Sequence, residues 1–200
     1  TPNNYETFAR GLGLGGAEVS WPFLHAGHKV DIIIEPVVMA AWATESDADP
    51  RILNEDSVGF ELDDSNLFRP NAAPNYDLWE PGGRVSVGVR ATARARNGQS
   101  MSLLLGRRFR SEVAPGFTVG ENLEDKNSDY VGAFEADLGR NFASDVRLRL
   151  DDESLSLQRI DAGVRTAFGR FSASARYYSI NEVLAPGNPN EEIYTQVGVE

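Results

Sequence analysis

Cysteine is absent from the 200 residues, and no apolar run is long. Without cysteine, a disulfide-built scaffold and a thiolate metal site are both excluded. The longest apolar run lies around Val37 to Ala43, far short of the roughly 20 apolar residues that a membrane-spanning helix needs. A helical membrane protein is therefore excluded. A membrane β-barrel is not, because its strands alternate lipid-facing and lumen-facing residues.

Basic residues are also few: 19 lysine and arginine residues stand against 30 acidic ones, for a formal net charge of −11. This balance argues against nucleic acid as a partner, because nucleic-acid-binding surfaces are basic. His25 and His28 lie in one short predicted turn, and two imidazoles without a third ligand favour a turn role over a metal site. Residues 1–4 have no signal-peptide character, which fits a mature, truncated or cytosolic chain.

A period of two dominates the segment from Arg84 to Arg96. Valine or alanine fills every second position, and the positions between carry four arginines among small and hydroxyl residues. Because successive strand side chains point to opposite faces, one face is apolar and the other is rich in arginine. The length exceeds the 5–6 residues typical of soluble strands, and it suffices for a tilted strand that crosses a bilayer in about 9–11 residues. The segment therefore favours a membrane strand.

The same alternation predicts nine strands, over residues 11–23, 29–43, 84–96, 99–111, 130–138, 146–150, 155–168, 171–178 and 193–200. Short turns at 25–28, 97–98, 139–141 and 169–170 alternate with connections at 44–82, 112–129, 151–154 and 181–192, of which all but 151–154 are long. Outer-membrane barrels separate short turns from long loops in this way. The three tryptophans lie near predicted strand ends, as interfacial aromatic residues do.

Closed bacterial barrels normally have an even number of strands, and nine is odd. We therefore predict an all-β fold, an antiparallel up-and-down transmembrane β-barrel that is incomplete, with about nine strands of a larger barrel. Residues 1–200 are expected to form one partial barrel domain with a long external loop at about residues 44–82.

Several short motifs, in their order along the chain, carry a family resemblance. They are Trp21-Pro22-Phe23, Ile34-Glu35-Pro36-Val37, Asn54-Glu55-Asp56-Ser57, Phe60-Glu61-Leu62-Asp63-Asp64-Ser65-Asn66-Leu67-Phe68, Tyr76-Asp77-Leu78-Trp79-Glu80-Pro81-Gly82-Gly83-Arg84 and Ser128-Asp129-Tyr130-Val131-Gly132. Together they resemble the central barrel region of the LptD family, the outer-membrane lipopolysaccharide-assembly proteins once called organic solvent tolerance proteins. The resemblance runs from about Ala17 to Asp151 and weakens beyond.

The resemblance implies a very large barrel with an LptE-like plug lipoprotein inside it, and a periplasmic domain that receives lipopolysaccharide from the periplasmic Lpt bridge. Lipopolysaccharide then leaves sideways between the first and last strands. The expected partners are lipopolysaccharide, the plug, outer-membrane lipid and, through a domain missing from these residues, the bridge. The expected location is the Gram-negative outer membrane. These residues would hold only middle strands, without the lateral gate and without the cysteines of some family members.

Arginine outnumbers lysine 17 to 2, and guanidinium groups bind phosphate and carboxylate through paired hydrogen bonds. The candidate lumen residues that face substrate or plug are Arg84, Arg90, Arg94, Arg147, Arg149 and Arg176. The alternative is that they pair with neighbouring carboxylates in a polar lumen.

The external loop motif comprises Asn54, Glu55, Asp56, Ser57, Asp63, Asn66, Leu67 and Phe68. Acids of this loop are typical ligands of a divalent cation, although the spacing is not that of an EF-hand. The alternative is an ordered, barrel-covering loop whose polar side chains bond the nearby backbone.

Neither an enzymatic activity nor a cofactor is expected, because the sequence shows no serine, histidine and acid trio. The glycine-rich stretch at residues 11–16 precedes an alternating segment and a proline rather than a helix, which argues against dinucleotide binding. The leading interpretation is the insertion of lipopolysaccharide into the outer leaflet as part of an LptD-like barrel. The alternatives are another outer-membrane barrel, either a porin or an enzyme, and a soluble β-sandwich binding module.

Overall fold

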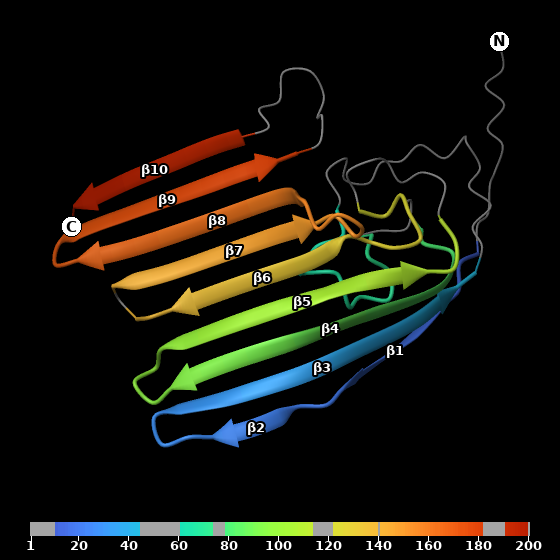
Figure 1. Ribbon diagram of the computed structural model, residues 1–200, viewed down its shortest axis with the longest axis horizontal. Helices are drawn as coiled ribbons and strands as arrows, with labels where there is room; N and C mark the ends of the chain where they lie inside the picture. The colour runs from blue at the N-terminus through green and yellow to red at the C-terminus, as the bar shows by residue number, and fades with distance from the viewer. Residues whose placement is uncertain are drawn as a thin grey trace, which may run out of the picture.

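The computed structural model describes residues 11–44, 61–73, 79–113, 122–139, 141–181 and 191–199, and these residues form one antiparallel sheet without helices (Figure 1). The strands are β1 (Leu14–Ser20), β2 (Phe23–Ala26), β3 (Val30–Ala43), β4 (Gly82–Ala95), β5 (Ser100–Arg110), β6 (Tyr130–Asp137), β7 (Phe142–Leu150), β8 (Leu157–Phe168), β9 (Phe171–Ile180) and β10 (Glu191–Val199). The described part of the chain contains no helix that is long and apolar enough to span a membrane.

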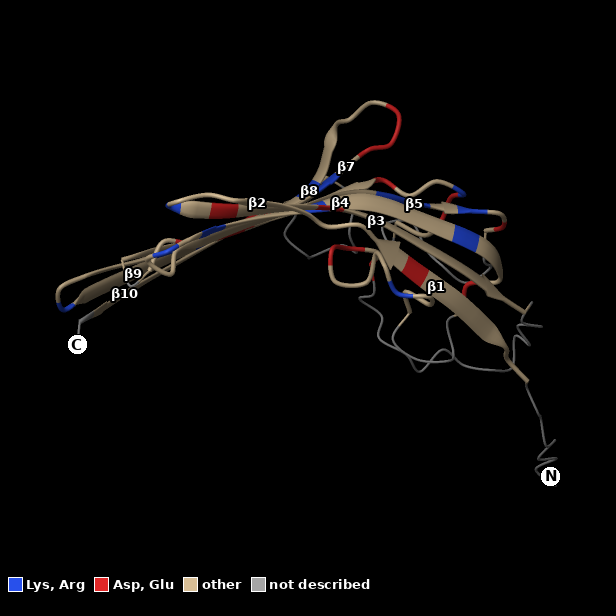
Figure 2. Cartoon of the chain, turned by 90° about the horizontal axis from the view of Figure 1, so that it is seen from below, with Lys and Arg blue, Asp and Glu red and all other residues tan. Residues whose placement is uncertain are grey.

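The strands pair in the order β1-β3-β4-β5-β6-β7-β8-β9-β10, and β2 pairs with β3 beside β1. From β3 onward each strand therefore pairs with its neighbours in sequence. This confirms the predicted all-β, antiparallel up-and-down fold. Among the described strands the sheet is open, with β1 and β10 at its edges. Figure 2 shows it edge-on as a curved layer, which is the geometry of an arc cut from a larger barrel.

The number of strands differs from the prediction, because residues 11–23 do not form one strand. Within the described residues the sheet has ten strands, and β1 and β2 are separated by Trp21 and Pro22. Proline has no N–H to donate to the ladder, so the strand is interrupted there and resumes on the same neighbour, β3. The Trp21 amide still donates to the Pro36 carbonyl at 3.1 Å across the interruption. His25, which was expected in a turn, lies in β2.

Short and long connections lie at opposite ends of the strands (Figure 1). The turns before β3, β5, β7 and β9 form one end, here called the turn end. The connections before β4, β6, β8 and β10 form the other, here called the loop end. Gly98, Gly139 and Gly169 lie in the turns with φ of +89°, +90° and +62°, a backbone conformation that side chains with a Cβ rarely adopt.

The register divides the sheet into two faces. Directly paired residues share a face, so the arginines of β4 lie with Met39 of β3 and Arg108 of β5 on what we call the inner face. Val85, Val87 and Val89 lie on the opposite, outer face. A small buried core of Leu62, Leu67, Ala72 and Leu123 lies where the long connections meet the sheet, with Phe68 and Leu104 against it. The tightly packed part of the described structure is therefore the loop end of the inner face.

Candidate functional site

The site is built where residues 61–73 of the connection between β3 and β4, here called the cover segment, lie on the inner face. Gly88 and Gly106 pair directly across β4 and β5 and leave a notch between them. A Cβ on Gly88 would lie 2.8 Å from Cζ of Phe68, and one on Gly106 would lie 2.8 Å from Cδ2 of Leu67. Only glycine at both positions leaves room for these two side chains.

A compact turn presents these two side chains to the notch. The Asp63 carboxylate accepts hydrogen bonds from the amide and hydroxyl of Ser65 at 2.8 and 2.7 Å. The Asn66 amide oxygen accepts from the Asp63 N–H at 2.9 Å, and its nitrogen donates to the Glu61 carbonyl at 2.8 Å. Short polar side chains that bond nearby backbone groups stabilise such turns. The turn therefore fixes the conformation that places Leu67 over the sheet.

Arg108 holds the cover segment to β5. Its Nη1 donates to both carboxylate oxygens of Glu80, at 2.8 and 3.1 Å, and the two side chains are 0% and 1% exposed. Its Nη2 donates to the backbone carbonyls of Asn66, Leu67 and Arg69 at 3.3, 2.6 and 2.7 Å. The buried charge of Arg108 is thus compensated within the protein, by the Glu80 carboxylate and by backbone carbonyls, as a buried charge requires.

Neither Arg108 nor Glu80 was singled out from the sequence, although both lie in segments that were. Alternation alone does not place Arg108 on the face of Arg84; the observed register does, because Arg108 pairs directly with Ser86. The sequence does not indicate which acid pairs with Arg108, because Glu80 belongs to a connection whose path no strand periodicity predicts. Trp79, expected at the membrane interface, is instead buried here and donates to the Thr44 carbonyl at 2.9 Å.

Two of the neighbouring arginines serve the backbone of the loops. Nη1 of Arg84 donates to the Glu80 carbonyl at 2.8 Å, and Nε donates to the Pro70 carbonyl. Arg110 donates to the Asp125 carbonyl through Nε at 3.0 Å and through Nη2 at 2.5 Å. One predicted lumen arginine is therefore a loop anchor, and Arg110 holds the connection between β5 and β6 in the same way.

The acidic side chains of the cover segment face three arginines of β7 and β8. Asp64 pairs with Arg147 at 3.3 Å. Glu61 pairs with Arg149 at 3.1 Å through one oxygen and with Arg159 through the other. Burial raises the pKa of Asp64 above its ordinary value, and the adjacent Asp63 charge adds to this effect. Two of the loop acids that the sequence offers to a divalent cation, Glu61 and Asp64, are thus engaged with guanidinium groups.

The other predicted lumen arginines also lie on the inner face. Arg90 lies over the ring of Phe68, 4.8 Å from its centroid, and 3.5 Å from the Glu18 carboxylate. Arg176 pairs with Asp145 at 2.9 Å. Arg94 is exposed nearer the turn end of β4. The motif residues Asn54, Glu55, Asp56 and Ser57 lie outside the described residues.

The turn end of the inner face, in contrast, is open. A groove of about 870 Å³ runs across β5 to β10. It is lined by hydroxyl, amide and charged side chains, among them Ser102, Glu135, Asp145, Arg176 and Gln196. The described inner face therefore has a covered half at the loop end and an open polar half at the turn end.

Three further acids gather beside the site, at the loop end. Carboxylate oxygens of Asp129, Asp151 and Asp152 lie within 4.8 Å of one another, a spacing that suits a hard cation. Asp129 already pairs with Arg149 at 3.3 Å, and Asp152 with Arg107 at 3.0 Å. Burial raises the pKa of Asp129 to about 6. Guanidinium groups thus already offset part of the charge of this cluster.

Comparison with known proteins agrees with this architecture. A search of curated proteins found no match. The family model of LptD, described as LPS transport system D, matches residues 1–200, which is the whole chain given. The chain therefore belongs to the LptD family, an outer-membrane family of lipopolysaccharide transport.

Proposed function

We propose that these residues form an arc of an outer-membrane barrel that inserts lipopolysaccharide into the outer leaflet and carries out no chemistry of its own. The observation that carries the proposal is the division of one continuous sheet into an apolar outer face and a charged inner face. On the inner face, polar groups can accommodate a saccharide or an LptE-like plug. On the outer face, side chains can contact outer-membrane lipid.

The outer face is apolar over adjacent strands. Ile34, Val85, Leu105 and Val164, from four different strands, are each at least 40% exposed. Soluble monomers rarely expose a contiguous apolar patch larger than a few hundred Å². A soluble β-sandwich would bury this face against a second sheet, and the described residues form a single sheet.

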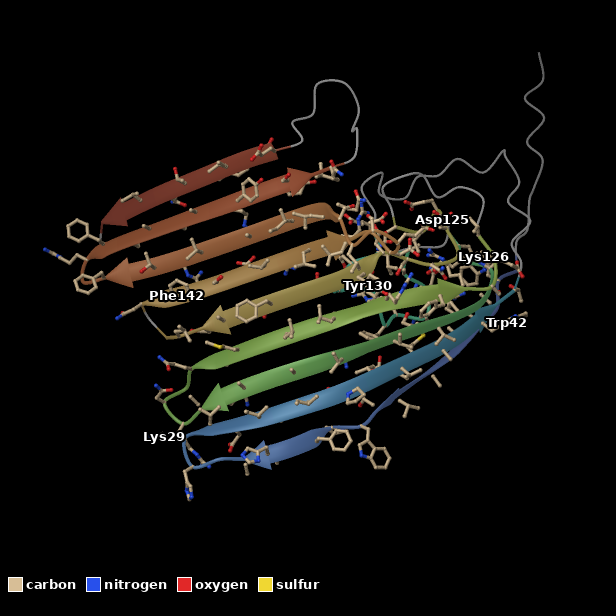
Figure 3. All side chains as sticks on the ribbon, viewed as in Figure 1. Lys29, Trp42, Asp125, Lys126, Tyr130 and Phe142 are labelled. Carbon is tan, nitrogen blue, oxygen red and sulfur yellow. The ribbon has the colours of Figure 1, made fainter. Side chains whose placement is uncertain are left out.

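The height of the apolar face fits a bilayer. Val85 to Ala95 covers about 33 Å along β4, and at a tilt of about 40° this becomes about 25 Å, the usual height of the apolar band. Aromatic side chains mark both ends of it (Figure 3): Trp42 and Tyr130 lie toward the loop end, and Phe142 lies at the turn end. Such girdles are typical of membrane barrels.

Labelling of the full-length protein in lipid vesicles tests the placement of the two faces. A carbene-generating lipid probe is expected to label Val85, Val87 and Val89 and to spare Arg90 and Arg94, as read by mass spectrometry of the β4 peptide. A water-soluble carbene reagent serves as the control and should give the opposite pattern. Preferential lipid labelling of the two arginines would overturn the placement.

Depletion of the full-length protein from cells tests the transport step. Newly made lipopolysaccharide should then fail to reach the cell surface, while a control outer-membrane porin still assembles during the first generations after depletion. Re-expression should restore surface lipopolysaccharide. Unchanged arrival of lipopolysaccharide after depletion would contradict the proposed function. The LptE-like plug and the periplasmic Lpt bridge are proposed partners of the same step, to be sought by crosslinking in these cells.

A further inference from the structure

Arg147, Arg149 and Arg159 form a compact cationic group on the inner face of β7 and β8. Arg149 and Arg159 are directly paired across the two strands, and Arg147 lies two residues along the same face. Like charges directly opposite one another are unfavourable unless an anion lies between them. An anionic group of the chain does so here, because the two carboxylate oxygens of Glu61 engage Arg149 and Arg159 separately.

The carboxylate of Glu61 bridges two guanidinium groups as two oxygens of a phosphate would. Arginine favours both anions for the same reason, since its planar donors match pairs of anionic oxygens. Asp64 forms an ion pair at 3.3 Å with Arg147, the third arginine of the group. We propose that Arg147, Arg149 and Arg159 are a binding site for a phosphorylated saccharide, which the carboxylates of Glu61 and Asp64 mask until the ligand displaces them.

The charges around the site support an anionic ligand once the mask is removed. Two nearby acids, Asp145 and Asp161, form ion pairs with Arg176 at 2.9 and 3.4 Å. Asp129 pairs with Arg149 at 3.3 Å. Asp145 and Asp161 also lie near Arg147, and Asp161 pairs directly with it across β7 and β8. Loss of the Glu61 and Asp64 charges would make the surroundings of the group more positive by two charges, which favours an anionic ligand.

The mask can exchange without unfolding the cover segment. The Arg147 and Arg159 side chains are 46% and 34% exposed, whereas Arg149, Glu61 and Asp64 are 2%, 12% and 16% exposed. The Arg108 anchor is fully buried. A cavity of about 30 Å³, room for about one water molecule, also lies at this contact. Leu62, which is buried, and the Arg108 bonds keep the backbone in place. Rotation of the Glu61 and Asp64 side chains would therefore open Arg147 and Arg159 first, and Arg149 would become accessible only after Glu61 leaves it.

Binding measurements on the folded full-length protein in detergent micelles test the site. The probes are a sugar phosphate, the same sugar without phosphate and inorganic phosphate, measured by calorimetry at low salt. Glu61→Gln removes the charge of the mask and keeps its shape. If the mask occupies the site about 90% of the time, this variant should bind the sugar phosphate about tenfold more tightly than the wild type. Added salt should weaken this binding.

Glu18→Gln is the matched control, because Glu18 also pairs with an inner-face arginine, Arg90, but lies away from the group. It should leave sugar-phosphate affinity unchanged, and Glu61→Gln with Arg159→Met should lose the gain. If Glu61→Gln does not fold, Asp64→Asn provides the same comparison at Arg147. An equal gain for the unphosphorylated sugar, or no gain in a folded unmasked variant, would overturn the site. Tight binding of inorganic phosphate alone would show an anion site without saccharide recognition and would also overturn it.

This inference rests on the proposed function only for the class of natural ligand. Failure of the binding experiment would leave the arrival of lipopolysaccharide at the surface unaffected. Failure of the depletion experiment would leave the affinity of these arginines for a phosphorylated sugar unaffected. The two experiments therefore fail separately.

Discussion

The buried pair of Arg108 and Glu80 makes the sharpest prediction about stability. Arg108→Met keeps most of the side-chain volume but removes the charge and its donors. Glu80 is then left as a buried carboxylate without its main partner, and the carbonyls of Asn66, Leu67 and Arg69 lose their donor. Removing one member of a buried ion pair costs about 3–5 kcal/mol. We therefore expect the free energy of unfolding to fall by at least about 3 kcal/mol.

A double-mutant cycle measures the coupling free energy between Arg108 and Glu80, apart from the effect of removing an arginine in general. Glu80→Gln alone should cost about 3 kcal/mol, because it leaves the Arg108 charge buried without its counter-charge. The double variant should cost clearly less than the sum of the two single variants, since residues in one network couple by about 0.5–3 kcal/mol. Arg94→Met is the matched control on the same face, at an exposed position, and should change stability by about 0.5 kcal/mol or less.

Urea unfolding of the full-length protein in lipid vesicles, followed by tryptophan fluorescence, provides the measurement. Trp79 lies one residue from Glu80 and is buried, so its emission should report release of the cover segment. Equal costs for Arg108→Met and Arg94→Met, or strictly additive costs around the cycle, would refute the anchoring role.

Two further predictions concern the notch and pH. Gly88→Ala should lower the free energy of unfolding by about 1–3 kcal/mol, because the new Cβ overlaps Phe68 and the strand backbone. Gly15→Ala is the control and should be tolerated, because Gly15 has open space around it. Equal urea midpoints for the two variants would contradict the notch. Burial raises the pKa of Asp129 from 3.8 to about 6. Between about pH 4 and 6 the folded state therefore keeps a proton that the unfolded state releases. The free energy of unfolding should fall as the pH rises through this range. Asp129→Asn should flatten this component, and an unchanged pH profile would exclude it.

Strand pattern and the two faces are local properties, so they could be predicted from the sequence. Alternation in the segment from Val85 to Ala95 gives the apolar face directly, because a strand sends successive side chains to opposite sides. Glycine in short turns likewise marks the turn end. The interruption at Pro22 was also visible as a residue without an N–H, although the period of two around it concealed the break.

The partners of the inner-face arginines were decided only by the tertiary structure. Glu61 reaches Arg149 and Arg159, and Glu80 reaches Arg108, across separations that no local period encodes. Which carboxylate meets which guanidinium depends on the path of a long connection, and that path is set by packing into the notch between two glycines. The sequence by itself determined an amphipathic sheet and a supply of charges. Folding of the cover segment onto that sheet decided which charges are buried as anchors and which remain near the open lumen.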